Sequence, residues 1–104
     1  MNPLDELRME VRAFSEARNW FQYQSPKNLV MAIAGEAGEL VAEFQWLTFD
    51  ESNVGAMTTE KLEAVRLEIA DVFIYLLRLS DELDFDLSDA VREKMKLNEL
   101  RFPT

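Results

Sequence analysis

The fold is decided by residues 67–77, which read LEIADVFIYLL. Apart from Glu68 and Asp71, this segment is apolar on nearly all sides, which is typical of a helix buried in the centre of a protein. Strands do not compete, because β-branched residues are few and no stretch alternates between polar and apolar residues. We therefore expect an all-α protein whose central, buried helix runs over about residues 58–83.

Cap residues place the other helices. Asn2-Pro3 and Ser25-Pro26 each combine a cap residue with a proline at the first helical position, which is typical of a helix start, and Asp86 is a further cap. A chain of 104 residues is one domain by length, so we predict a single domain over residues 1–104 with a bundle-like arrangement of four helices. The expected helices end before a loop at 19–27, near Leu47 before a loop at 48–57, near Leu83 and near Leu100.

Four carboxylates occur as two pairs with the same spacing. Glu36 and Glu39 lie in the second predicted helix, and Glu68 and Asp71 lie in the third. A spacing of three places both members of a pair on one helix face, and two antiparallel helices would bring the two faces together. Burying carboxylates without a compensating charge is costly, and a divalent cation held by oxygen ligands would compensate it. We therefore predict a metal site here, in preference to the alternative that these are solvated surface acids.

The composition limits the chemistry of this site. The chain has no cysteine and no histidine, which excludes thiolate ligands and argues against zinc of the usual kind and against a Ser–His or Cys–His nucleophile. Oxygen-only ligation points to Mg²⁺ or Mn²⁺. The formal net charge of −9 argues against nonspecific binding to nucleic acid or to an anionic membrane. Because no signal peptide and no apolar stretch of roughly 20 residues is visible, we expect a soluble cytoplasmic protein.

Three segments together resemble a known family. They are NLVMAIAGEAGELVAEFQW at 28–46, LEIADVFIYLL at 67–77 and KMKLNELRFP at 94–103. Over residues 14–103 the chain resembles the all-α nucleoside triphosphate pyrophosphohydrolases of the MazG-like superfamily, with its greatest likeness to the dCTP pyrophosphatase branch. The resemblance implies cleavage between the α- and β-phosphates of a (deoxy)nucleoside triphosphate, which gives the monophosphate and pyrophosphate. It also implies a MazG-type fold completed by homo-oligomerisation, as a tetramer built from two dimers.

The resemblance assigns roles to individual residues. It implies Mg²⁺ at the four acids, with Mn²⁺ as a possible substitute, and a position for Asn28 at the opening of the metal-binding helix. It leaves the base preference open, because relatives carry histidines where this chain has Val11 and Gln24. The remaining implied roles are phosphate binding by Lys94, Asn98 and Arg101, and a base pocket lined by Trp20, Trp46 and Tyr75.

Several alternatives stay open. Without histidine, the base that activates water must be a carboxylate or a metal-bound hydroxide, and we assign this role to Glu39. The chain could instead be a non-catalytic helical interaction module, or it could hydrolyse another pyrophosphate-bearing substrate such as phosphoribosyl-ATP. The sequence does not choose the sugar or the number of metal ions. For the expected contact between copies of the chain, the candidate residues are Phe44, Trp46, Leu47 and Phe49.

Overall fold

The computed structural model describes residues 2–104, and within them the chain is helical and contains no strand. This confirms the all-α class predicted from the sequence. No helix in this part of the chain is both long enough and apolar enough to cross a membrane. The helices are α1 (Pro3–Ala17), the short 3₁₀ helix η1 (Phe21–Tyr23), α2 (Pro26–Phe44), α3 (Thr59–Glu82) and α4 (Leu87–Arg101).

Side-chain caps start each of the long helices. Asn2 Oδ1 accepts a hydrogen bond from the backbone N–H of Asp5 at 2.9 Å, as the sequence predicted, and three other residues cap in the same way. Each cap satisfies an N–H that has no partner inside the helix and stabilises the protein by about 1 kcal/mol. The three others are Ser25 for α2, Thr58 for α3 and Asp86 for α4.

The predicted end of α2 near Leu47 was wrong, because the helix ends at Phe44. Lys61 of α3 supplies the physical reason. Its Nζ donates to the carbonyl oxygen of Glu43 at 2.9 Å and lies 3.2 Å from the carboxylate of the same residue. A cation thereby binds one of the carbonyl groups that the last helical turn leaves without a partner. Residues 45–58 then form the connection to α3.

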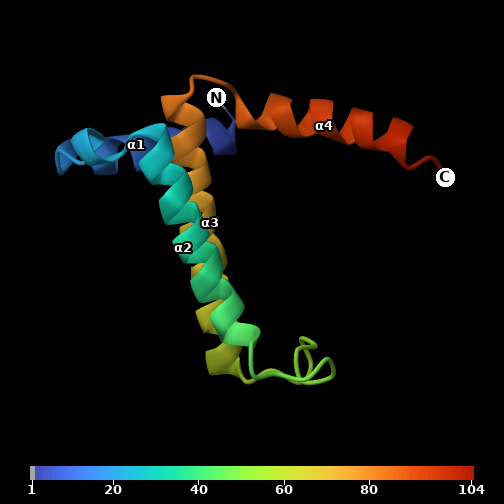
Figure 1. Ribbon diagram of the computed structural model, residues 1–104. Coiled ribbons are helices and arrows are strands. Elements are labelled where there is room, and N and C mark those ends of the chain that lie inside the picture. The colour runs from blue at the N-terminus through green and yellow to red at the C-terminus, as the bar shows by residue number, and fades with distance from the viewer. Residues whose placement is uncertain (1) are drawn as a thin grey trace.

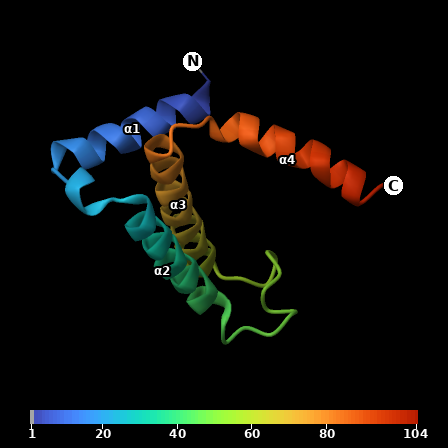
Figure 2. The ribbon, with the colours of Figure 1, turned by 45° about the horizontal axis from the view of Figure 1, so that its top comes forward.

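Helices α2 and α3 lie side by side, α1 lies across the end of this pair, and α4 points away from it (Figure 1, Figure 2). The predicted four-helix bundle is therefore not formed within one chain. The chain turns at Asp84, whose φ of 58° is in the left-handed region, and α4 starts in a new direction. Every residue of the second half of α4 except Asn98 is exposed, so this helix buries little against its own chain.

The core of a single chain is small, with Leu29, Val65 and Leu77 as its buried apolar residues. We expected α3 to be buried on nearly all sides, and this was wrong for one chain. Leu67 and Ile69 are 52% and 53% exposed. The reason is that, among residues 2–104, the helices that pack extensively against α3 are α1 and α2, which leave part of its circumference uncovered.

Ion pairs fix α1 on the C-terminal end of α3. Asp81 of α3 is only 7% exposed and receives Arg8 of α1 at 2.6 Å and Arg78 of its own helix at 3.2 Å. Arg12 of α1 lies 3.6 Å from the same carboxylate. Because breaking a buried charge pair is far more costly than breaking an exposed one, this cluster holds the two helices in one relative position.

Candidate functional site

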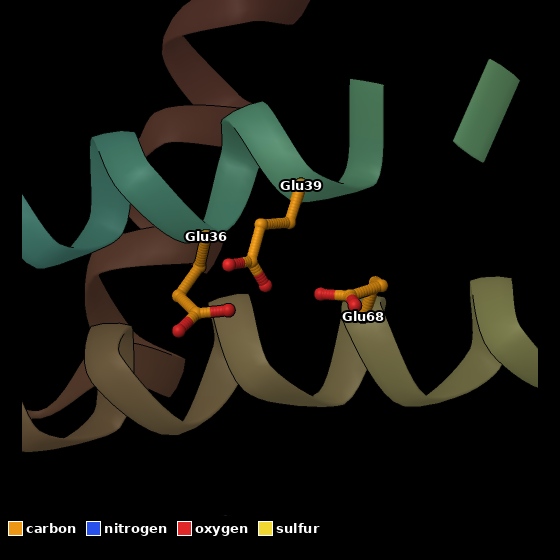
Figure 3. Close-up of side chains that lie close together, drawn as sticks. All are labelled: Glu36, Glu39 and Glu68. Carbon is orange, nitrogen blue, oxygen red and sulfur yellow. The ribbon is translucent and has the colours of Figure 1, made fainter. Parts of the chain in front are cut away.

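Three of the four predicted acids meet between α2 and α3. Glu36 and Glu39 come from α2 and Glu68 comes from α3, and their side chains point toward one another (Figure 3). One carboxylate oxygen from each lies within 4.8 Å of the others. The spacing of three residues places Glu36 and Glu39 on the face of α2 that packs against α3, which is why they can meet Glu68.

Asp71 lies outside this trio but close to it. It follows Glu68 by three residues on α3, and its charge contributes to raising the pKa of both Glu36 and Glu68. It also lines a cavity together with Glu36. The four acids therefore form one electrostatic unit, although only three of them converge on a common point.

Burial and mutual repulsion act on two of the carboxyls in the same direction. Burial raises the pKa of Glu36, and the charges of Glu39 and Asp71 raise it further. The pKa of Glu68 is raised by burial and then by the charges of Glu39, Asp71 and Glu36. Both groups hold their protons more strongly than ordinary glutamates do. The raised pKa values show that no nearby cation offsets the negative charges of these carboxylates among the described residues.

Full burial of all four acids was expected and is not observed, since Glu39 and Asp71 are exposed. In Glu36 and Glu68, which are half-buried, one carboxylate oxygen of each is fully buried. Glu36 Oε2 and Glu68 Oε2 have almost no solvent exposure and no hydrogen-bond partner among the described residues. A buried carboxylate oxygen without a partner is costly, and a cation bound at these atoms would remove that cost.

A hard divalent cation fits this donor set. Mg²⁺ and Mn²⁺ prefer carboxylate oxygens, which are what Glu36, Glu39 and Glu68 present from two helices. A cation among them would pair the two orphaned oxygens and lower both raised pKa values. The residues present therefore fit the predicted metal, with Asp71 beside them.

A cavity of about 430 Å³ opens next to the acids. Its walls come from α1, the segment before α2, α2 itself and α3. Two of the predicted base-pocket residues, Trp20 and Tyr75, line it, and Phe14 adds a third aromatic ring that meets Trp20 edge-on at 5.5 Å. Because Glu36 and Asp71 form part of the same wall, the aromatic rings and the acids face one space.

A second, smaller cavity of about 300 Å³ shares Trp20, Gln24 and Tyr75 with the first. Asn28 lines this cavity and donates from Nδ2 to the carbonyl oxygen of Tyr23 at 3.0 Å. The structure therefore places Asn28 beside the aromatic residues and not among the acids. Its side chain holds the η1 segment against the start of α2.

Four predicted site residues join neither the acids nor the two cavities within one chain. Trp46 is 86% exposed in the connection after α2. The three others lie on α4, which points away from the α2–α3 pair (Figure 1). Their roles stay predictions. These three are Lys94, Asn98 and Arg101.

Among the other residues that line the large cavity, Phe14, Gln24 and Arg78 were given no site role from the sequence. A signal existed for Arg78, because it follows Asp71 by seven residues, or two helical turns, and is a lone cation in an apolar run. Gln24 was noted only as a position where relatives carry a histidine, and its contact with α3 joins residues far apart in the sequence.

Comparisons with known proteins identify the family of this chain. Residues 31–103 match the MazG-like family. The chain is 37% identical over 100 residues to dCTP pyrophosphatase 1 of Homo sapiens and 36% identical over the same length to that of Bos taurus. Each match covers 96% of this chain but 59% of the relative, so the chain spans about three-fifths of the length of these curated relatives.

A solved structure extends the likeness to the fold. The crystal structure of a pyrophosphatase from Archaeoglobus fulgidus superimposes with a TM-score of 0.85 at 38% sequence identity, and the match covers 100% of this chain and 95% of that chain. The family match, the identity to the curated relatives and the shared fold agree, and on this evidence the chain belongs to the MazG-like family.

Proposed function

We propose that this protein is a Mg²⁺-dependent pyrophosphohydrolase that cleaves a (deoxy)nucleoside triphosphate resembling dCTP into the monophosphate and pyrophosphate. One observation carries the proposal: three converging carboxylates with orphaned buried oxygens share a wall with a cavity lined by aromatic rings. Such a space suits a ligand with a flat base at one end and a polyphosphate at the other. The names of the relatives, dCTP pyrophosphatase and pyrophosphatase, support the same reaction.

The acids account for the metal requirement. The chain carries a net charge of −9, and its acidic cluster would repel a triphosphate on its own. Held by Glu36, Glu39 and Glu68, with Asp71 nearby, Mg²⁺ would supply the positive charge that attracts the triphosphate and offsets charge on the leaving pyrophosphate. The two helices hold these side chains in place before substrate binds, which is how electrostatic stabilisation becomes effective.

Because the chain has no histidine, the attacking water is activated either by a carboxylate or as a metal-bound hydroxide, and a carboxylate is our choice. We assign this role to Glu39, which is exposed on the face of α2 that meets α3. The water attacks the α-phosphorus, the bond from that phosphorus to the bridging oxygen breaks, and pyrophosphate leaves. Positioning of the water by the fixed carboxylates contributes more to such phosphoryl chemistry than covalent catalysis does.

The aromatic wall would hold the base. Trp20 and Tyr75 offer flat faces, and stacking on such a face contributes about 1–3 kcal/mol per base without choosing strongly among bases. Trp20 is half-exposed, so part of its ring is accessible to a ligand, and Phe14 meets it in a T-shaped contact.

The phosphate-binding residues require a second copy of the chain. Lys94, Asn98 and Arg101 lie on one face of α4, but α4 points away from the acids of its own chain. A homo-oligomer, which we propose is a tetramer of paired dimers, would place α4 of one copy near the site of another. The uncovered faces of α3 and the exposed rings of Trp46 and Phe49 supply apolar surface for such contacts.

The direct test is release of pyrophosphate from a panel of deoxy- and ribonucleoside triphosphates, with Mg²⁺ and then with EDTA. We expect release that requires the metal and is fastest with dCTP or a related nucleotide. Absence of release from every nucleotide, in a folded protein that also fails to bind Mg²⁺, would contradict the proposal and favour an interaction module.

A further inference from the structure

The orientation of one amide in the cavity wall is fixed by a buried arginine. Gln24, which follows η1, lines both cavities and is half-buried. Its Oε1 accepts a hydrogen bond from Arg78 Nε at 2.9 Å. This contact joins the segment before α2 to α3.

The Arg78 guanidinium is held in one orientation. It is 1% exposed, its Nη1 donates to Asp81 at 3.2 Å and its Nη2 donates to Glu82 at 2.7 Å. Its guanidinium also lies 4.2 Å from the centre of the Phe21 ring. Three side chains accept hydrogen bonds from the Arg78 nitrogens, and the Phe21 ring packs near its guanidinium. Arg78 is therefore a fixed donor to Gln24 and is not available to bind substrate itself.

An arginine has only donors, so the oxygen of the Gln24 amide must face it. The amide nitrogen then points the other way, and the usual ambiguity between the two ends of a glutamine side chain does not arise. Among residues 2–104, no acceptor forms a hydrogen bond with Gln24 Nε2. Gln24 therefore offers an N–H donor, without a partner, on a wall that it shares with Trp20 and Tyr75.

We propose that Gln24 is a specificity-determining residue that donates from Nε2 to a carbonyl oxygen of the substrate base, and that Arg78 is the positioning residue that sets this donor. The proposal rests on the proposed function, since it assigns a base to the aromatic cavity. The substrate class that it names is a nucleoside triphosphate whose base carries a carbonyl oxygen.

The selectivity follows from what the base edges offer. Cytosine, thymine, uracil and guanine each present a carbonyl oxygen, which has two lone pairs in the plane of the ring. Adenine has no carbonyl group: its acceptors are ring nitrogens with one lone pair each, and its amino group is a donor that would oppose the amide N–H. A Gln24 donor placed for a carbonyl oxygen would lack that partner with adenine, which penalises adenine relative to the other bases.

The test compares Gln24→Met with Gln22→Met. Methionine keeps the length of the side chain and removes the amide. Gln22 is a matched control, because it is a glutamine of the adjacent η1 helix whose Nε2 donates to the carbonyl oxygen of Asn19 at 3.0 Å, away from the large cavity. The measurement is kcat/KM for pyrophosphate release from dCTP, dTTP, dGTP and dATP and from 2-deoxyribose 5-triphosphate, which has no base.

We expect wild-type protein and Gln22→Met to prefer the carbonyl-bearing bases over dATP. In Gln24→Met, the ratio of kcat/KM for these nucleotides to that for the base-free triphosphate should fall about tenfold, the size of one neutral hydrogen bond. An unchanged ratio in Gln24→Met, or a wild-type preference for dATP, would overturn the inference while the proposed function stands. If wild-type protein releases no pyrophosphate from any of these compounds, the proposed function itself fails and the inference falls with it.

The role of Arg78 is tested through a double-mutant cycle. Arg78→Met should lower the same ratio, mainly through KM, and the double variant should show no further loss, because both substitutions remove one interaction. A merely structural arginine would reduce kcat/KM for every substrate alike and would add to the effect of Gln24→Met. If Arg78→Met does not fold, as circular dichroism would show, the result with Gln24→Met alone decides the inference.

Discussion

The α2–α3 pair and α4 differ in how much of their chemistry a single chain completes. On α2 and α3, side chains from both helices converge, and the cavity beside them is closed by α1 and the segment before α2. On α4, the polar residues suited to phosphate lie on a helix that packs against little of its own chain. Under the proposed function, the site is divided: intrachain packing builds the half that would bind the metal, and the half that would bind phosphate depends on association between copies.

The largest expected effect comes from the converging acids. Glu36→Gln or Glu68→Gln should lower kcat for nucleotide hydrolysis by about 10³-fold or more, since the metal site contributes several kcal/mol to the barrier. The helical content by circular dichroism should not change. Glu60→Gln is the matched control, because Glu60 is an exposed acid in the first turn of the same helix as Glu68 and should retain its rate. Near-normal rates in the two site variants would remove the acids from the mechanism.

A mixing experiment tests the division between the two regions directly. Arg101→Ala should lower kcat/KM by about 10–100-fold, because a charge-assisted phosphate contact contributes roughly 1.5–3 kcal/mol. If α4 acts on the site of a neighbouring copy, refolding Arg101→Ala together with Glu68→Gln in equal amounts should restore about a quarter of wild-type activity, since that share of sites receives both intact residues. Recovery no greater than the sum of the two variants would show that α4 does not act across copies.

The sequence carried enough information to locate the acids and the helix starts. Caps such as Ser25 depend on contacts only three residues away, and the meeting of Glu36 with Glu68 follows from helical spacing once two helices pack. The direction of α4 and the exposure of Leu67 depend on which helices pack against each other, and no local sequence pattern encodes those contacts. The contact between Gln24 and Arg78 joins positions 54 residues apart, so only the folded chain shows it.

The third expected effect concerns pH and metal together. The folded protein holds the protons of Glu36 and Glu68 more strongly than the unfolded chain does, because both pKa values are raised. Their contribution to stability is therefore complete below the ordinary pKa of 4.5 and is lost as the pH rises through the raised values. Metal-free protein should then lose stability between acidic and neutral pH, and Mg²⁺ at about 100 times its Kd should restore about 2.7 kcal/mol at neutral pH.

Urea unfolding with and without Mg²⁺ measures this effect. Glu68→Gln isolates the contribution of Glu68 to the pH dependence of stability. The variant keeps the remaining carboxyls, including Glu51 and Glu63, whose lowered pKa values make stability rise with pH. The variant should be more stable than wild type in EDTA at neutral pH and should gain less from Mg²⁺. Equal Mg²⁺ stabilisation of both proteins would place the cation elsewhere.

The smallest expected effect is a difference between the monomer and the oligomer in what the loss of a helix cap costs in stability. Ser25→Ala and Asp86→Ala remove equivalent caps, from α2 and from α4, and each costs its helix about 1 kcal/mol. Because α2 packs against α3, the first substitution should lower the free energy of unfolding by that amount at any protein concentration. The second should have almost no effect at concentrations where the chain is monomeric, since fraying of α4 there breaks few contacts.

At concentrations where sedimentation shows an oligomer, the two costs should become equal if α4 is packed against a neighbour. Equal costs in the monomer would mean instead that α4 already docks on its own chain, and the division of the site between copies would no longer hold.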